Sequence, residues 1–304
     1  ATTEIYTLSL HDALPICPRG GGSGMKRNRQ NILLNSPYIA WSVIFIIVPL
    51  IFVVYYAFTD QSGAFTFQNV KDFFTSGIYM SVFGRSVAYA FWATLICLII
   101  GYPFAYCMTK INISAQRMCM LLIMLPMLMN LIVRTYSWRQ ILENNGIINK
   151  LLTSLGLGSV QFLGNAGVII FGMVYNYLPF MILPIYLVIS KVDRSLTEAS
   201  ADLGCNAVGT MKRVIFPLSI PGVLSGITMV FVPCISTFYI SYEFSNGMIK
   251  MIGDVIEDKF YKSSEVNYNM GATISLVLMV LILISLAIVN RFSDDGVESG
   301  GVVV

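Results

Sequence analysis

The residues best placed to make specific contacts lie in a short polar segment between two long apolar runs. Ser195 and Glu198 are three residues apart, the spacing of a capping box, in which a hydroxyl and a carboxylate bond to backbone N–H groups at a helix start. A helix is therefore predicted to begin near Leu196 and to end at Gly204, which can adopt the left-handed conformation. A helix of about two turns does not persist in water without a partner surface. The segment is predicted to dock onto another protein.

This predicted helix carries one apolar face. Leu196, Ala199 and Leu203 fall on that face at helical spacing, and small side chains at Ser200 and Ala201 let the walls of a groove come close. An ordinary capped amphipathic turn is the alternative, and a capping box alone would favour it. The residues assigned to the docking segment are Ser195, Glu198, Ala199, Asp202, Leu203 and Gly204.

Polar side chains inside apolar runs form a second group of candidates. Asn130 and Arg134 are four residues apart, which places them on one helix face, and Tyr175 and Asn176 lie beside prolines in another run. Hydrocarbon penalises such groups, so they usually face a bundle interior or a watery path. Hydrogen bonds between helices for the asparagines, and an Arg134 that reaches toward the membrane surface, are the alternatives. Both interpretations stay open.

Composition predicts the elements that must position these residues. The chain is 56% hydrophobic and only 12% charged, with a mean hydropathy of +0.73, far from the composition of a soluble domain. An all-α membrane protein is predicted. Six stretches are long enough to cross roughly 30 Å of hydrocarbon: 38–58, 86–109, 118–137, 167–189, 218–240 and 270–290.

Positive charge indicates the orientation of these spans. With both termini in the cytoplasm, ten Lys and Arg residues lie inside and seven outside, and the inside residues sit in short segments near membrane ends. The loop 190–216, which contains the docking segment, is then cytoplasmic. The expected divisions of the chain are a segment with the first span and an external loop, a transmembrane core and a cytoplasmic tail: 25–85, 86–290 and 291–304.

Residues 1–24 lack the basic start and apolar core of a signal peptide and are expected to be a non-native leader. His11, the only histidine, lies in it. Hydrolases that use histidine as a base and metal sites built on imidazole are therefore disfavoured. No cysteine pair has the spacing of a metal or redox motif. We expect no disulfide, no metal site and no cofactor bound by this chain.

Three further expectations concern packing and loops. Gly222 and Gly226 are four residues apart and would let helices approach closely, within the chain or, alternatively, in a dimer seam. Residues 147–155 have the period of a short amphipathic helix. The loop 241–269 holds five acids against three lysines, which predicts an acidic surface.

The docking segment resembles the EAA loop of binding-protein-dependent ABC importer permeases. Glu198 is followed by Ala199, then by Gly204 six residues after Glu198, and by Pro217 beyond an apolar residue. Ser200 stands where the family has alanine, a change between small residues. Other segments are similar to the first permease subunits of spermidine/putrescine importers, and the resemblance covers nearly all of 25–292: residues 93–105, 178–181, 238–241 and 271–273.

The resemblance implies a type I ABC importer permease fold in a bacterial cytoplasmic membrane. Its partners would be a homologous second permease subunit, a cytoplasmic ATPase dimer that binds ATP and Mg, and an external substrate-binding protein. This chain contains no G-x-x-x-x-G-K-[ST] phosphate loop, so it is not expected to hydrolyse ATP itself. Force would pass through the helix of residues 195–204.

A polyamine substrate is also implied, and carboxylates and aromatic faces are the natural partners of such a polycation. Candidate groups are Tyr175, Tyr239, Tyr242 and Glu243, and Tyr242 stands where the family has an acidic residue. An ABC permease for another small solute is one alternative. A secondary transporter working alone is another, disfavoured because no acid or histidine lies in the middle of a span. An intramembrane enzyme ranks far below these, and nucleic acid is not an expected partner at a net charge of +3.

Overall fold

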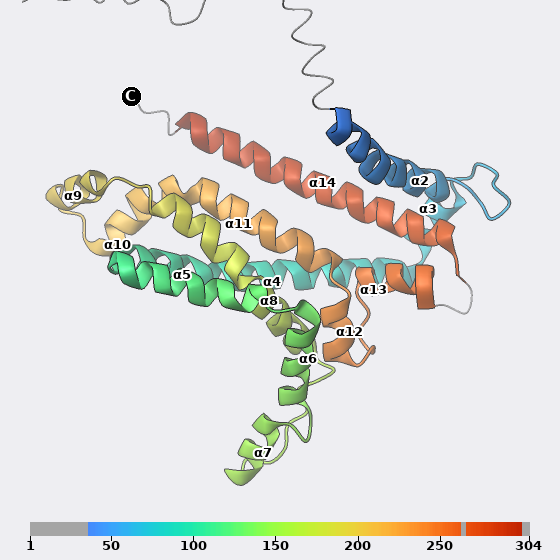
Figure 1. The fold of residues 1–304 in the computed structure, drawn as a ribbon, viewed down its shortest axis with the longest axis horizontal. Coiled ribbons are helices and arrows are strands. Elements are labelled where there is room, and N and C mark those ends of the chain that lie inside the picture. The colour runs from blue at the N-terminus through green and yellow to red at the C-terminus, as the bar shows by residue number, and fades with distance from the viewer. Residues whose placement is uncertain (1–35, 263–265, 300–304) are drawn as a thin grey trace, which may run out of the picture. The chain divides into compact units, whose positions relative to one another are not determined.

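The computed structural model describes residues 36–262 and 266–299 (Figure 1). In these ranges every regular element is a helix, and one isolated antiparallel bridge joins Thr59 to Phe65. The expected leader, residues 1–24, lies outside the described part of the chain. The predicted all-α class is therefore confirmed for the residues that the structure covers.

The elements after the first helical residues are, in chain order, η2 Val43–Ile47, α2 Val48–Ala57, α3 Gln68–Thr75, α4 Gly77–Lys110, α5 Ile113–Leu128, α6 Leu131–Leu142, α7 Ile147–Ser154, α8 Ala166–Ile189, α9 Arg194–Asp202, α10 Ala207–Thr210, η3 Met211–Ile215, α11 Phe216–Ser236, α12 Tyr239–Ser245, α13 Ile252–Glu257, η4 Asp258–Lys262 and α14 Tyr268–Ser299. Contacts divide the chain into two compact units, residues 1–52 and 53–304. In the first unit, the apolar side chains of residues 38–52 are largely exposed, as expected for a helix surrounded by lipid.

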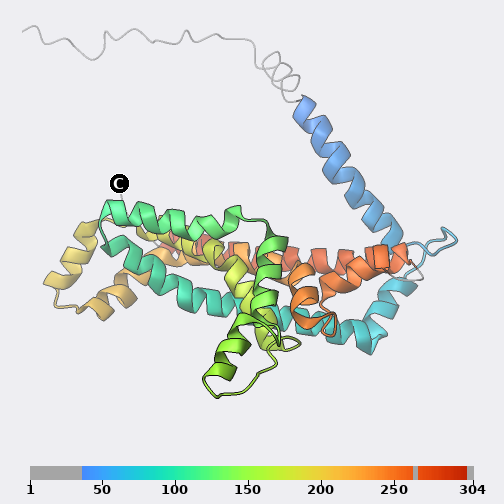
Figure 2. The same cartoon turned by 60° about the horizontal axis from the view of Figure 1, so that its bottom comes forward.

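Helices α4, α8 and α11 pack against one another in the second unit, and α14 packs on α11 (Figures 1 and 2). Glycine allows the close approach of α11 to α8. A Cβ atom on Gly222 would lie 2.9 Å from the Pro184 carbonyl oxygen, and one on Gly226 would lie 2.7 Å from the Met181 sulfur. The predicted role of these glycines in packing within the chain is confirmed.

Five helices among the described residues are long and apolar enough to cross a membrane, namely Ser36–Ala57, Gly77–Lys110, Ala166–Ile189, Ala207–Ser236 and Tyr268–Val289. The predicted spans 38–58, 167–189 and 270–290 agree with these helices to within two residues. The second span begins at Gly77, earlier than predicted, because the helix continues beyond its apolar stretch. The tail predicted from residue 291 continues α14 as far as Ser299.

The predicted third span, 118–137, is not one helix. The helices on either side of Met129 and Asn130 are bent by 91°, and together they pass the test for a sixth span. Pro126 has no N–H to continue the helical ladder, and the Asn130 side chain accepts the Ile132 N–H at 2.8 Å as the N-cap of α6. Asn130 therefore starts a new helix, one turn before Arg134, whose N–H bonds to the Asn130 carbonyl oxygen at 3.1 Å. The continuous span predicted over 118–137 was wrong.

Helices at the two ends of the bundle carry the candidate sites. Figure 1 places α9 and α10 at one end, and α12 and α13 toward the other. Helices α6 and α7 lead away from the bundle in both views (Figures 1 and 2). Helix α7, Ile147–Ser154, is the short helix that the sequence predicts over 147–155.

Candidate functional site

The candidate docking helix is α9, and its N-cap is Asp193, whose carboxylate accepts the Ser195 N–H at 2.9 Å. The prediction of a helix start near Leu196, capped by Ser195, was wrong because Asp193 is an equally good cap and begins the helix two residues earlier. Bonds from the Ser195 backbone and hydroxyl lower the pKa of the Asp193 carboxyl. Gly204, with a φ of +82°, adopts the predicted left-handed conformation after the helix.

Most described side chains of α9 face outward. Leu196 is 46% exposed and Leu203, the C-cap residue, is 86% exposed. Glu198 is also exposed. Ser200 is the one buried side chain among those described in α9, and its hydroxyl lies 2.6 Å from the Thr210 hydroxyl of α10. The apolar face that the sequence assigns to a partner's groove is therefore uncovered in this chain.

A polar cavity of about 440 Å³ lies beside α9. Thr197 and Glu198 contribute to its wall, together with Lys110 at the end of α4 and Gln116 in α5. The Tyr186 hydroxyl of α8 donates to the Gln116 side chain at 2.9 Å. Glu198 thus borders a space lined by polar groups, and it is not part of a packed contact with the bundle.

At the other candidate region, Arg134 and Tyr175 come together. Arg134 is buried, donates a hydrogen bond to the Pro126 carbonyl oxygen, and places its guanidinium 5.8 Å from the centre of the Tyr175 ring. Trp138 packs edge-on against the same ring at a centroid distance of 5.2 Å. Arg134 therefore folds back across the bend between α5 and α6 and does not reach outward, contrary to one of the two interpretations of the sequence.

The two asparagines in this group do not join helices, as one interpretation of the sequence had them do. Asn176 is buried and donates to the Gly172 carbonyl oxygen of its own helix at 2.8 Å, while its side-chain oxygen is buried without a hydrogen-bond partner. Asn130 caps α6 and is exposed. Arg134 and Tyr175 are therefore paired by the structure, whereas Asn130 and Asn176 make local contacts.

Helix α12 presents the predicted carboxylate. Glu243 is 8% exposed, and its carboxylate lies 2.5 Å from the Arg139 guanidinium of α6. Tyr239, one turn earlier on α12, also contacts Glu243, and burial raises the pKa of the Tyr239 hydroxyl, with a further rise from the Glu243 charge. Tyr242 is half exposed on the same helix. Sequence reasoning missed Arg139, which carries no local signal beyond its charge.

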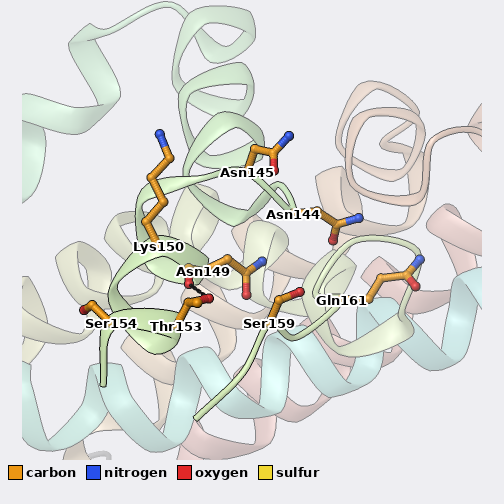
Figure 3. A pocket seen from close by; sticks show the side chains of 8 residues that line it. All are labelled: Asn144, Asn145, Asn149, Lys150, Thr153, Ser154, Ser159 and Gln161. Carbon is orange, nitrogen blue, oxygen red and sulfur yellow. Dashed lines mark hydrogen bonds between the residues drawn. The ribbon is translucent and has the colours of Figure 1, made fainter. Parts of the chain in front are cut away.

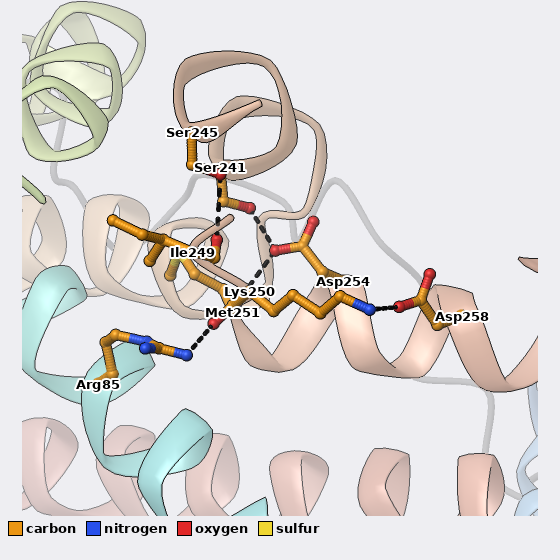
Figure 4. A network of polar contacts seen from close by, with 8 residues as sticks. All are labelled: Arg85, Ser241, Ser245, Ile249, Lys250, Met251, Asp254 and Asp258. Carbon is orange, nitrogen blue, oxygen red and sulfur yellow. Dashed lines mark hydrogen bonds and ion pairs between the residues drawn. The ribbon is translucent and has the colours of Figure 1, made fainter. Parts of the chain in front are cut away.

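A second carboxylate at this end, Asp254, is the centre of a buried polar network (Figure 4). Its Oδ2 atom accepts the Ser241 hydroxyl at 2.6 Å and the Met251 N–H at 2.7 Å. Its Oδ1 atom is buried without a hydrogen-bond partner in the described structure. Nearby, the Ser86 hydroxyl of α4 accepts the Ile252 N–H at 2.8 Å. The network fixes α13 against both α12 and α4.

These contacts correct the expectation of an acidic surface over 241–269. Asp254 is 6% exposed, Glu243 pairs with Arg139, and Asp258 pairs with Lys250. Of the five acids, Glu265 lies outside the described residues, and three of the other four are buried or neutralised by a cation. Loop composition could not indicate this, because the partner of Glu243 comes from a distant helix.

The Asp254 network predicts a stability that depends on pH. Burial raises the pKa of the Asp254 carboxyl to about 6, so between about pH 4 and pH 6 the folded chain holds a proton that the unfolded chain releases. The resulting stabilisation, at most about 3 kcal/mol, is complete below pH 4 and is lost as the pH rises through 6. The melting temperature of the purified assembly should therefore fall between about pH 4 and pH 6. Asp254→Asn should flatten this dependence, and an unchanged slope would contradict the assignment.

A polar cavity of about 820 Å³ lies near the α6–α7 connection (Figure 3). Asn149 lies in its wall but is buried, donates to the carbonyl oxygens of Glu143 and Val160, and accepts the Val160 N–H at 2.8 Å. This side chain therefore holds its own loop together. The cavity wall contains no described carboxylate, and it lacks the groups expected to hold a polycation.

Comparison with known proteins adds a family and several relatives. Residues 93–297 match the family of binding-protein-dependent transport system inner membrane components. The spermidine/putrescine transport system permease protein PotB of Haemophilus influenzae is 33% identical over 260 residues, which cover 83% of this chain and 90% of that protein. PotB of Escherichia coli is 30% identical over 263 residues, which cover 84% of this chain and 94% of that protein.

Solved structures share the fold at low sequence identity. A bacterial ABC transporter involved in the import of the acidic polysaccharide alginate matches with a TM-score of 0.75 at 16% identity, over 89% of this chain and 96% of that chain. The MetNI methionine ABC transporter in an inward-facing conformation matches with a TM-score of 0.53 at 14% identity, over 73% of this chain and 99% of that chain. The likeness extends to the arrangement of helices.

Proposed function

We propose a function from the premise that this chain belongs to the family of binding-protein-dependent transport system inner membrane components: it is the permease subunit of an ATP-driven ABC importer of spermidine and putrescine. It resides in the bacterial cytoplasmic membrane as a multi-pass protein, and it is a transport subunit whose ATP hydrolysis is performed by a partner. The polyamine assignment is supported by two PotB relatives that are 30–33% identical over more than four fifths of this chain.

The complete transporter contains this chain, a homologous second permease subunit, a cytoplasmic ATPase dimer and an external binding protein that delivers the polyamine. ATP and Mg bind to the ATPases. One solved relative in fold, the alginate transporter, is described in complex with a pentasaccharide-bound periplasmic protein. A binding protein of that kind would approach the end of this bundle where α12 lies, opposite α9.

Helix α9 carries the proposal. It is short, capped at Asp193, ended by a left-handed Gly204, and exposes Leu196 and Leu203, an arrangement suited to insertion into a groove of an ATPase. Packing within this chain does not account for the exposure of Leu196 and Leu203. The end of the bundle that bears α9 therefore faces the cytoplasm. The distribution of Lys and Arg along the sequence supports a cytoplasmic location for both termini. The conformational change of the ATPase is transmitted to the bundle through α9 and α10.

The polyamine path runs past α6, α8 and α12. Glu243 supplies a carboxylate, and Tyr175, Tyr239 and Tyr242 supply aromatic rings, which attract ammonium groups through their faces. Asn130, Arg134 and Asn176 belong to the helices beside this path and help to position them. Asn130 caps α6, and Asn176 bonds within α8. This assignment makes Glu243 the group that first receives a cationic end of the substrate.

Replacing Glu243 by glutamine should reduce ATP-dependent spermidine uptake by about tenfold or more, because a hydrogen bond to a charged group contributes about 1.5–3 kcal/mol. Glutamine keeps the shape of the side chain. Uptake would be measured in vesicles that contain all subunits, with putrescine as the second substrate. If the native complex takes up another solute but neither spermidine nor putrescine, the polyamine assignment is contradicted.

Asp258→Asn is the matched control for this variant. Asp258 is also an ion-paired carboxylate on the same part of the chain, with Lys250 as its partner, but it lies on η4 and not on the proposed path. Its replacement removes the same unit of negative charge, and uptake should stay within about twofold of the native value. Equal losses in the two variants would show that overall charge, and not Glu243 itself, governs uptake.

A further inference from the structure

The two groups best suited to hold the ends of a polycation are already occupied by cations of the chain itself. Arg139 lies 2.5 Å from the Glu243 carboxylate, and Arg134 lies over the Tyr175 ring at 5.8 Å. Both arginines belong to α6, whereas Glu243 belongs to α12 and Tyr175 to α8. One helix, α6, therefore supplies the cations that occupy both of these groups.

Arg134 and Arg139 lie five residues apart on α6, which corresponds to a rise of about 7.5 Å along the helix axis. Each guanidinium contacts a group that would also bind an ammonium: a carboxylate in one case and an aromatic face in the other.

The two arginines differ in how firmly they are held. Arg134 is buried, and its guanidinium is also bonded to the Pro126 carbonyl oxygen, so it is fixed to the bend between α5 and α6. The Arg139 side chain is 29% exposed, whereas that of Glu243 is only 11% exposed. Arg139 can therefore swing into water, while Glu243 stays where it is and needs a cation beside it.

We propose that Arg139 is a tethered competitor of the substrate: it occupies Glu243 while the site is empty, and an ammonium group of the polyamine displaces it. This inference rests on the proposed function and adds a specificity-determining residue to it. Leaving the Glu243 charge unpaired at low exposure would be costly, whereas exchanging one cation for another keeps it neutralised throughout. Release is eased for the same reason, since Arg139 returns as the polyamine moves on.

The competition also selects among substrates. A monoamine offers one ammonium group and gains only the contact that Arg139 already makes. A polyamine offers further ammonium groups that reach additional rings, such as Tyr239 beside Glu243 and the exposed Tyr242. Displacing Arg139 is therefore favourable for a molecule with several positive charges and unfavourable for one with a single charge.

Equilibrium binding of radiolabelled spermidine to the complete transporter in lipid nanodiscs, without the external binding protein, tests this proposal. Arg139→Gln should lower the Kd for spermidine about threefold to tenfold, because the internal competitor is gone. Lys250→Gln is the control that removes the same positive charge from the exposed Lys250–Asp258 pair, and its Kd should stay close to the native value. A Kd for Arg139→Gln that is unchanged or higher overturns the proposal.

A double variant separates competition from a purely structural ion pair. Glu243→Gln alone should weaken binding, and adding Arg139→Gln in that background should give no gain, because the competitor then has no carboxylate to occupy. A gain in spermidine affinity that persists without Glu243 overturns the proposal. The charge-swapped pair, Arg139→Glu with Glu243→Arg, is a further control. If Arg139→Gln fails to assemble while this pair assembles and binds spermidine like the native complex, the ion pair is purely structural and the proposal is also overturned. If the native complex takes up no polyamine with ATP, the proposed function fails and this inference with it; native uptake with equal Kd values for Arg139→Gln and Lys250→Gln refutes the inference alone.

Discussion

ATP-driven uptake by the assembled transporter is expected to fall below detection when Glu198 is replaced by lysine or Gly204 by aspartate, while the permease remains inserted in the membrane. Glu198 is exposed on α9 and Gly204 ends that helix with a φ of +82°. A few central residues of a protein interface each cost about 2 kcal/mol or more of binding free energy when they are truncated. Glu198→Lys would place a cation in the middle of the proposed contact between α9 and the groove of the ATPase. Gly204→Asp would disrupt the turn after α9 and redirect α10.

Two measurements identify the cause of this loss. Co-purification of the ATPase with the tagged permease reports docking, and uptake in vesicles reports coupling. Both should be lost in Glu198→Lys, whereas the amount of permease in the membrane should not change, because the exposed Glu198 makes no packed contact with the bundle. Normal uptake by this variant would contradict the assignment of α9 to the ATPase.

Gly63→Asp is the matched control for Gly204→Asp. Gly63 also has a positive φ, +80°, and a Cβ atom at either glycine would meet nothing within 4 Å. Forcing a side chain into the left-handed region costs about 1–2 kcal/mol at both positions. The backbone strain is therefore equal, and only the position of the turn differs. Uptake should survive in Gly63→Asp, and equal loss in the two variants would assign the defect to strain.

The position of helix α9 could be predicted closely because its signals are local. The polar segment, the helical spacing of Leu196 and Leu203, and a glycine at the end are all contiguous in sequence, and they define α9 to within two residues. The exact cap was missed since Asp193 and Ser195 are both good caps, and sequence does not tell which begins the helix. Which partner α9 meets depends on a surface that lies outside this chain.

The break between α5 and α6 was missed for a different reason. The hydropathy averaged over the whole stretch 118–137 is high, so it predicts one span. The signals for a break, Pro126 and Asn130, were present, but either residue alone is tolerated inside a membrane helix. The bend turns α6 toward α12, where Arg139 pairs with Glu243.

Long-range pairs could not be predicted at all. Glu243 was identified as a candidate from its type and place, yet its partner is 104 residues away in sequence. Asp254 was counted only as one acid of a loop, although it is buried and joins α12 to α13. A single sequence contains the charges of such groups but not their pairing, which the packing of α4, α6 and α12 decides.

Gly172→Ala is expected to destabilise the permease by about 1–3 kcal/mol and to weaken spermidine binding. A Cβ atom at Gly172 of α8 would lie 2.0 Å from the ring of Phe244, which is fully buried on α12 next to Glu243. Either the ring or α12 must move, and the Glu243 carboxylate moves with α12.

Gly167→Ala makes the same substitution on the same helix, where a Cβ atom meets nothing within 4 Å. Alanine there should be neutral or stabilising by about 0.5–1 kcal/mol, because glycine loses more conformational freedom in a helix. The melting temperature of the purified complex should therefore fall in Gly172→Ala and stay the same or rise in Gly167→Ala. Spermidine binding should weaken only in Gly172→Ala. If both variants melt and bind alike, the contact between Gly172 and Phe244 does not set the position of α12.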